Sequence, residues 1–89
     1  MERIEFRVSG KVQGVGFRFR VLQASQNFEV KGFVKNLDSG KVLVEAEGEK
    51  EQLELFFDTV KNFSFTEITG TKVKWKKFLG EFRDFSVRH

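Results

Sequence analysis

The 89-residue sequence contains no cysteine, no proline and no tyrosine, and it has a single histidine. The lack of cysteine excludes disulfide bonds and thiolate metal sites. Because it also fits a reducing compartment, we expect a cytoplasmic protein. No apolar run approaches the length that spans a bilayer, and the alternating N-terminus lacks the apolar segment of a signal peptide. We therefore expect no membrane association.

The sequence also lacks the side-chain clusters on which many enzymes depend. No group of histidine, cysteine and carboxylate residues suggests a metal site, and no Ser/His/Asp set suggests a nucleophilic triad. The one histidine, His89, is the last residue, where we expect a frayed end. We expect no metal and no cofactor.

What the chain does contain is typical of a small folded domain. Hydrophobic residues make up 39% and charged residues 33%, which favours a globular protein over a disordered one. The length supports one domain, residues 1–89, with one core, and twelve phenylalanines supply most of its aromatic bulk. The net charge of +3 mildly favours anionic partners, either nucleic acid or a small phosphorylated molecule.

Hydrophobic periodicity predicts two helices and five strands. The strands are expected at residues 3–9, 30–36, 41–47, 68–78 and 82–87, and the helices at residues 17–28 and 49–63. This order predicts an α+β fold, a ferredoxin-like α/β sandwich with βαββαβ order plus a short C-terminal strand. We expect an antiparallel sheet with both helices on one face. The fold hosts many unrelated functions, so it identifies none by itself.

The segment GKVQGVGFRFR, Gly10 to Arg20, connects the first strand to the first helix. It does not match the GxGxxG or Walker phosphate patterns. However, a helix N-terminus favours an anion, and Gly14 and Gly16 would let successive amides converge. Arg18 opposes the helix dipole at a cost of about 0.3–1 kcal/mol, unless an anion binds there. From these residues alone, an oxyanion site and an ordinary turn with solvated arginines, Arg20 included, are equally good interpretations.

Three other features have a functional and a structural interpretation. Lys31-Gly32-Phe33 begins like an RNA-recognition signature, but the following residues depart from it. Asn36, taken alone, is typical of a turn. Lys72, Lys74 and Lys76 share one strand face, which is either a basic stripe or the charged side of an edge strand. The alternative function is therefore a ferredoxin-like nucleic-acid-binding module that uses these lysines and an exposed Phe33. Trp75 is expected in the core or on a packed strand face.

Together, the two glycine-containing segments resemble the acylphosphatase family. That family has a Gly-x-Val-Gln-Gly-Val-x-Phe-Arg loop, then Gly-aromatic-Val-x-Asn, Gly-x-Val and a later glycine. The sequence matches every fixed position, with Gly10 to Arg18, Gly32 to Asn36, Gly40 to Val42, and Gly48. It departs from the family's usual Gly-Pro after the second helix, where it has Asn62-Phe63-Ser64. That departure leaves the form of the loop before the fourth strand open.

The resemblance implies metal-independent hydrolysis of the carboxyl-phosphate bond of an acyl phosphate to a carboxylate and inorganic phosphate. It implies that Arg18 and Asn36 are catalytic, with Asn36 orienting the attacking water. The phosphoryl group would be bound by Gln13, Gly14, Val15, Gly16, Phe17 and Arg18. The chemistry agrees, because a good leaving group mainly requires positioning and charge stabilisation. We expect a monomer that binds a small acyl phosphate and no nucleic acid. A third interpretation is a domain that binds an acyl phosphate as part of a larger maturation enzyme. The absence of zinc-binding cysteines and of a flanking domain disfavours that interpretation.

Overall fold

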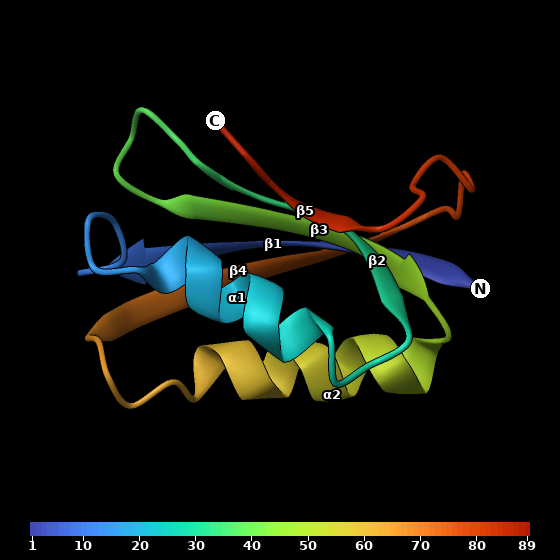
Figure 1. Cartoon of the computed structure of the whole chain (residues 1–89), viewed down its shortest axis with the longest axis horizontal. Helices are drawn as coiled ribbons and strands as arrows, with labels where there is room; N and C mark the ends of the chain where they lie inside the picture. Colours follow the sequence, from blue (N-terminus) through green and yellow to red (C-terminus); the bar gives the residue numbers. More distant parts are fainter.

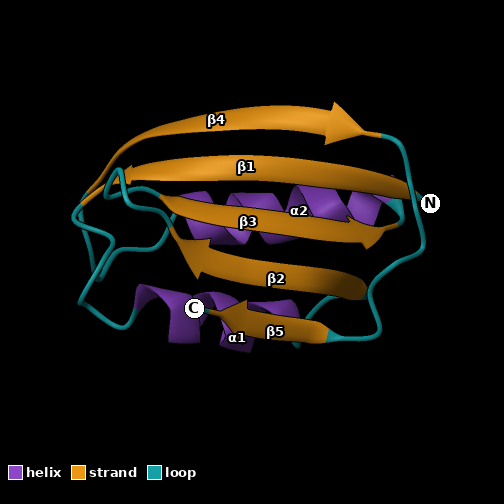
Figure 2. Cartoon of the chain, turned by 90° about the horizontal axis from the view of Figure 1, so that it is seen from above, coloured by secondary structure: helices purple, strands orange, loops and turns teal.

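Seven helices and strands make up this computed structural model, which describes all 89 residues. Five strands form one sheet in the order β4-β1-β3-β2-β5, and both helices lie against the same face of it (Figures 1 and 2). The elements are β1 (Glu2–Gly10), α1 (Phe17–Ser25), β2 (Val30–Asn36), β3 (Val42–Gly48), α2 (Lys50–Lys61), β4 (Ile68–Lys76) and β5 (Phe85–Arg88). The predicted ferredoxin-like fold is confirmed.

The core lies between the sheet and the helices. Ile4, Phe6 and Val8 of β1 are fully buried, because alternate residues of a strand point to the same face. The helices meet them with side chains at helical spacing, which are Phe17, Val21 and Ala24 of α1 and Leu53, Phe56 and Val60 of α2. Burying one such large side chain stabilises the fold by about 1.5–3 kcal/mol. This apolar layer is therefore the main source of stability.

The sheet is mixed, whereas the sequence predicted an antiparallel one. All pairings are antiparallel except that of β5, which runs parallel to β2 with Lys35 opposite Arg88. The reason is topological. β4 ends opposite the start of β1, at the end of the sheet where β2 begins. The chain then crosses that end to reach the far edge (Figure 2). A strand that starts there must run in the direction of β2.

The first helix is shorter than its apolar spacing predicted. α1 ends at Ser25, and the next three amides bond three residues back rather than four, as in Phe28 N–H to the Ser25 oxygen at 3.2 Å. This tight last turn brings the chain round into β2. Phe28 still packs against the core from outside the helix.

The sheet face away from the helices carries paired charges. Lys76 Nζ lies 2.7 Å from Glu5 Oε1, and this hydrogen bond lowers the pKa of the Glu5 carboxyl below its usual range. Lys74 is directly opposite Glu5 on the edge strand β4. The lysine stripe thus forms the charged side of an edge strand, where Lys76 is already neutralised by a carboxylate.

Two aromatic residues differ from the sequence-based expectation. Phe33 is buried at 6% exposure, because the Arg88 guanidinium lies 4.0 Å from its ring centroid and Phe82 packs against it at 5.9 Å. The nucleic-acid-binding alternative needs an exposed Phe33 ring, so that expectation is wrong. Trp75, expected to be packed, is 42% exposed, because it lies on the edge strand β4.

Gly32 in β2 gives a test of how closely the central strands pack. A Cβ built on Gly32 would lie 2.7 Å from the Ala46 Cα and closer still to the backbone oxygen of Glu45. We expect Gly32→Ala to lower the free energy of unfolding by about 1–3 kcal/mol, because β3 would have to move. Urea unfolding followed by Trp75 fluorescence measures the loss.

Gly70→Ala in the edge strand β4 is the matched control. A Cβ on Gly70 would meet nothing within 4 Å, so its unfolding free energy should change by less than about 0.5 kcal/mol. Equal stabilities of the two variants would contradict the packing argument.

Candidate functional site

The loop between β1 and α1, residues 11–16 and here called the glycine loop, is anchored at both ends. Val12 and Phe17 are each 1% exposed, whereas Gly14, Val15 and Gly16 between them are exposed. Gly14 and Gly16 have φ values of 75° and 76°. A Cβ would meet nothing within 4 Å at either position. Glycine is therefore favoured by the left-handed backbone rather than by lack of space.

The glycine loop presents backbone amides that the protein itself does not use. Gly16 caps α1 without a side-chain hydrogen bond, and the first turn of α1 contains no acidic residue. None of the amides of residues 13–19 donates a hydrogen bond to another protein group, and the first helical bond is Arg20 N–H to the Gly16 oxygen at 3.1 Å. These donors lie at the positive end of a helix dipole, so the arrangement favours an anion.

The loop before β4, residues 62–67, packs against both ends of the glycine loop. Phe63 packs edge-on against Phe17 with ring centroids 5.6 Å apart, and Phe65 packs against Phe63 at 5.3 Å. The Lys11 amide donates to the Glu67 oxygen at 2.8 Å, and the Thr66 hydroxyl donates to the Lys11 oxygen. Aromatic packing and two backbone contacts thus fix this segment, in which the chain lacks the Gly-Pro of the resembled family.

Gln13 joins the glycine loop to the β2–β3 hairpin. Its side-chain Nε2 donates to the Leu37 oxygen at 2.8 Å and to the Lys41 oxygen at 3.0 Å. The sequence suggested only a backbone role for Gln13. Its side-chain role was missed because the partners lie 24 and 28 residues further along the chain.

Asn36, the last residue of β2, is brought beside the glycine loop by this bridge to Leu37. Its Oδ1 atom is buried and has no hydrogen-bond partner. A buried acceptor without a partner costs about 1–3 kcal/mol. Asn36 thus ends β2 with an unpaired oxygen, next to the residue that Gln13 contacts, and it makes none of the turn contacts expected of an isolated asparagine.

Arg18 lies in the first turn of α1, half-buried and without an acidic partner. Its Nη1 atom lies 3.1 Å from His89 Nδ1 and 3.4 Å from the Arg88 oxygen. His89 lies beyond the end of β5 and is exposed, as expected of a terminal residue, and its ring lies beside Arg18 because β5 packs against α1. Arg20 is exposed, as expected, and its guanidinium lies over the Phe65 ring, 4.6 Å from the centroid.

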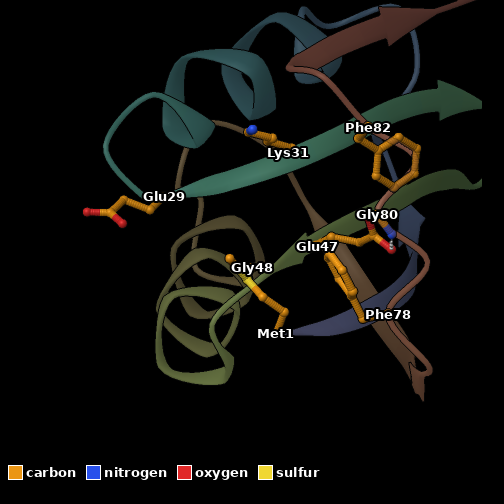
Figure 3. Close-up of a pocket in the computed structure, with 8 residues that line it drawn as sticks. All are labelled: Met1, Glu29, Lys31, Glu47, Gly48, Phe78, Gly80 and Phe82. Atoms are coloured by element: carbon orange, nitrogen blue, oxygen red, sulfur yellow. Dashed lines mark hydrogen bonds between the residues drawn. The ribbon is translucent and has the colours of Figure 1, made fainter.

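A hollow of about 200 Å³ lies at the start of β1, at the end of that strand away from the glycine loop (Figure 3). Glu47 lines it, but its Oε2 accepts hydrogen bonds from the Leu79 and Gly80 amides at 2.7 and 3.2 Å. This carboxylate therefore holds the β4–β5 connection in place.

The structure contains no group of three or more His, Asp or Glu side chains that could share a metal ion. The helices are all too short or too polar to cross a bilayer.

The description Acylphosphatase belongs to the family model that matches residues 4–87. The chain belongs to the acylphosphatase family. An acylphosphatase from Methanospirillum hungatei JF-1 is 44% identical over 90 residues, which cover 99% of this chain and 98% of that protein. Acylphosphatases are hydrolases that act on acyl phosphates, so the expected activity and small-molecule substrate class are confirmed.

Solved structures agree with this acylphosphatase assignment. The crystal structure of acylphosphatase from Bacillus subtilis superimposes with a TM-score of 0.93 at 36% identity, and each chain is covered completely. Full-length HypF in its phosphate- and nucleotide-bound form has a TM-score of 0.89 at 32% identity. This chain is covered to 99% in that match but spans only 12% of HypF. An acylphosphatase-like unit therefore also occurs within a much longer protein.

Proposed function

We propose that this acylphosphatase hydrolyses the carboxyl-phosphate bond without a metal, using the glycine loop and Arg18 to hold the phosphoryl group and Asn36 to place the water. The observation that carries the proposal is the run of amides, residues 13–18, that make no hydrogen bond within the protein. They lie at the start of α1, in the same turn as a guanidinium without an acidic partner.

Binding of the phosphoryl group would resolve two local conflicts in the free protein. An anion would accept hydrogen bonds from the unpaired amides, and it would reverse the unfavourable meeting of the Arg18 charge with the helix dipole. The Nε and Nη2 atoms of Arg18 make no hydrogen bond within the protein. They therefore remain available to phosphoryl oxygens, with the short, charge-assisted geometry that a guanidinium favours.

Asn36 suits the attacking water because it has an unused acceptor. A water that donates one hydrogen to the buried Oδ1 has its lone pairs turned away from the amide. The Gln13 bridge keeps the end of β2 against the glycine loop, so this water would be held beside the bound phosphoryl group. Positioning of this kind can supply a large share of a hydrolytic rate enhancement.

The reaction needs no strong base in this scheme. The water oxygen forms a bond to phosphorus as the phosphorus–carboxylate oxygen bond breaks, and the carboxylate leaves as a stable anion. We propose that a phosphoryl oxygen takes the proton of the water, which yields inorganic phosphate. The protein then contributes positioning and charge stabilisation, and the arginine and amides supply both.

We also propose that residues 1–89 act as one cytoplasmic, monomeric domain. The edge strand β4 supports the monomer, because its exposed Lys72, Lys74 and Lys76 disfavour pairing with a second sheet. Sedimentation equilibrium should give a mass near 10.4 kDa. Twice that mass would contradict the monomer.

Replacement of Arg18 by lysine tests the phosphoryl-binding role. We expect Arg18→Lys to lose most of the activity, on the order of 10²-fold or more in kcat/KM, because a point charge cannot replace a planar two-nitrogen donor. The assay is phosphate release from benzoyl phosphate with a chelator present. Arg20→Lys is the matched control, since Arg20 lies on the outer side of the helix against Phe65, and its activity should remain within about twofold. Near-normal turnover by Arg18→Lys would contradict the assignment.

Replacement of Asn36 by alanine tests the placement of the water. We expect kcat to fall by a factor on the order of 10²–10³ if the contact is made in the transition state. KM should change little, since the phosphoryl group is held by other residues. Stability should not fall, because the variant removes a buried oxygen that has no partner. The same assay and a thermal melt measure both, and an unchanged kcat in a folded variant would contradict the role.

A further inference from the structure

Phe19 is the most exposed aromatic residue of the chain, at 59%, although it lies in the first turn of α1 next to the unpaired amides. It is not part of the core. No other ring packs against it, and no arginine or lysine lies over it. The free protein therefore leaves a large apolar surface uncovered at the edge of the proposed site.

The direction of the Phe19 side chain follows from the position of α1 on the sheet. Phe17, the first residue of the helix, faces the core at 1% exposure. Successive residues of a helix are about 100° apart around its axis, so Phe19 faces away from the sheet that α1 covers (Figure 1). Helical side chains also lean toward the N-terminus of their helix. Phe19 is thus directed toward Val15, which is itself 46% exposed in the glycine loop.

The two arginines that flank Phe19 in the sequence leave this surface uncharged. Arg18 is hydrogen-bonded to the end of the chain after β5. Arg20 lies on another side of the helix, with its guanidinium over the Phe65 ring at 4.6 Å. The exposed side chains of Phe19 and Val15, here called the apolar rim, therefore lie between two charged groups that are engaged elsewhere.

The proposed reaction directs the acyl group toward the apolar rim. Asn36 follows the buried Val34 by two residues, so its side chain lies on the sheet face that the helices cover. A water held by Asn36 would approach phosphorus from the side of the sheet. The attacking and leaving oxygens are roughly in line in phosphoryl transfer. The leaving carboxylate oxygen and its acyl group therefore lie on the side away from the sheet, where Phe19 faces.

We propose that the apolar rim binds the acyl group of the substrate, and that Phe19 makes the enzyme favour acyl phosphates with a bulky, apolar acyl group. The proposal rests on the proposed function. An acyl group that covers the ring removes the apolar surface of both from water, and an aromatic acyl group adds ring–ring packing. An acetyl group covers little of the rim. The substrate KM should therefore fall as the acyl group grows.

The test compares three acyl phosphates that share the same reacting bond, namely acetyl, butyryl and benzoyl phosphate. Phosphate release gives kcat and KM for wild type, Phe19→Ala and Phe19→Leu in the full chain. Leu55→Ala is the matched control, because Leu55 is an exposed apolar residue of the other helix, at 44%. Differences in leaving-group chemistry between the substrates are common to all four proteins and cancel in their ratios.

We expect Phe19→Ala to raise KM about five- to tenfold for benzoyl phosphate and no more than about twofold for acetyl phosphate. The kcat values should stay within about twofold, because the acyl contact is present both before and during bond breakage. Phe19→Leu should lose less for butyryl than for benzoyl phosphate, and Leu55→Ala should keep the wild-type ratios. Equal KM changes for acetyl and benzoyl phosphate in Phe19→Ala would overturn the proposal. So would a wild-type KM that does not depend on the acyl group.

A second copy of the chain is the other occupant that an exposed apolar surface could have. Sedimentation equilibrium of wild type and Phe19→Ala at the assay concentration separates the two. Both should have a mass near 10.4 kDa. A wild-type dimer that dissociates when Phe19 is replaced would overturn the acyl-binding role.

Binding of two phosphonates separates this proposal from the proposed function. In phenacylphosphonate and acetonylphosphonate a methylene group replaces the bridging oxygen, so neither is hydrolysed, and calorimetry gives their Kd values. Wild type should bind the phenacyl compound about five- to tenfold more tightly, and Phe19→Ala should lose most of this preference.

The two failures have different results. If wild type binds both phosphonates but hydrolyses no acyl phosphate, the hydrolytic function fails, and the two Kd values still decide the role of Phe19. If hydrolysis is normal and Phe19→Ala keeps the preference, only the acyl-binding role fails. If wild type binds neither phosphonate, the phosphoryl site and the apolar rim both fail.

Discussion

The burial of Phe17 is the interaction on which the site depends. Its ring is 1% exposed and packs against Phe63, so the first residue of α1, the core and the loop before β4 are fixed together. Gly16 must then adopt a left-handed backbone to join the glycine loop to the helix. Arg18 follows Phe17 in α1 and is directed out of the core. An apolar contact thus sets where the unpaired amides and the guanidinium lie.

The two sides of the proposed site come from separate parts of the chain, and hydrogen bonds to main-chain oxygens join them. Gln13 ties the glycine loop to the hairpin that follows Asn36, and Arg18 donates to the Arg88 oxygen. The strand β5 lies outside the βαββαβ unit, yet its last residue, Arg88, and the next residue, His89, contact Arg18. It therefore does more than extend the sheet, since it limits the freedom of a long and flexible side chain at the point where an anion would bind. Limiting that freedom before binding lowers the entropic cost of binding.

The proposed site explains why the sequence needs no metal-binding cluster and no Ser/His/Asp set. Backbone amides and one guanidinium can stabilise the charge of a phosphoryl group in transfer, and a carboxylate leaving group needs no general acid. A site of this kind is built mainly from main-chain atoms, so its requirements on the sequence are conformational and fall on the glycines. A unit of similar structure, 32% identical in sequence, makes up 12% of the full-length HypF chain. Such recurrence is understandable, because the glycine loop, α1 and the hairpin beside them are all contained within the unit.

The sequence by itself determined the number and order of the elements, the fold class and the candidates Arg18 and Asn36, because periodicity and short motifs are local properties. The bounds of β2 were predicted to the residue, and α1 was predicted three residues too long. Only the tertiary structure decided the parallel direction of β5, the burial of Phe33, the bridge from Gln13 and the contact of His89 with Arg18. The contacts of Gln13 and Arg18 join residues from 24 to 71 positions apart. Local patterns carry no information on such pairs, since they form only when the sheet closes and the strand ends meet.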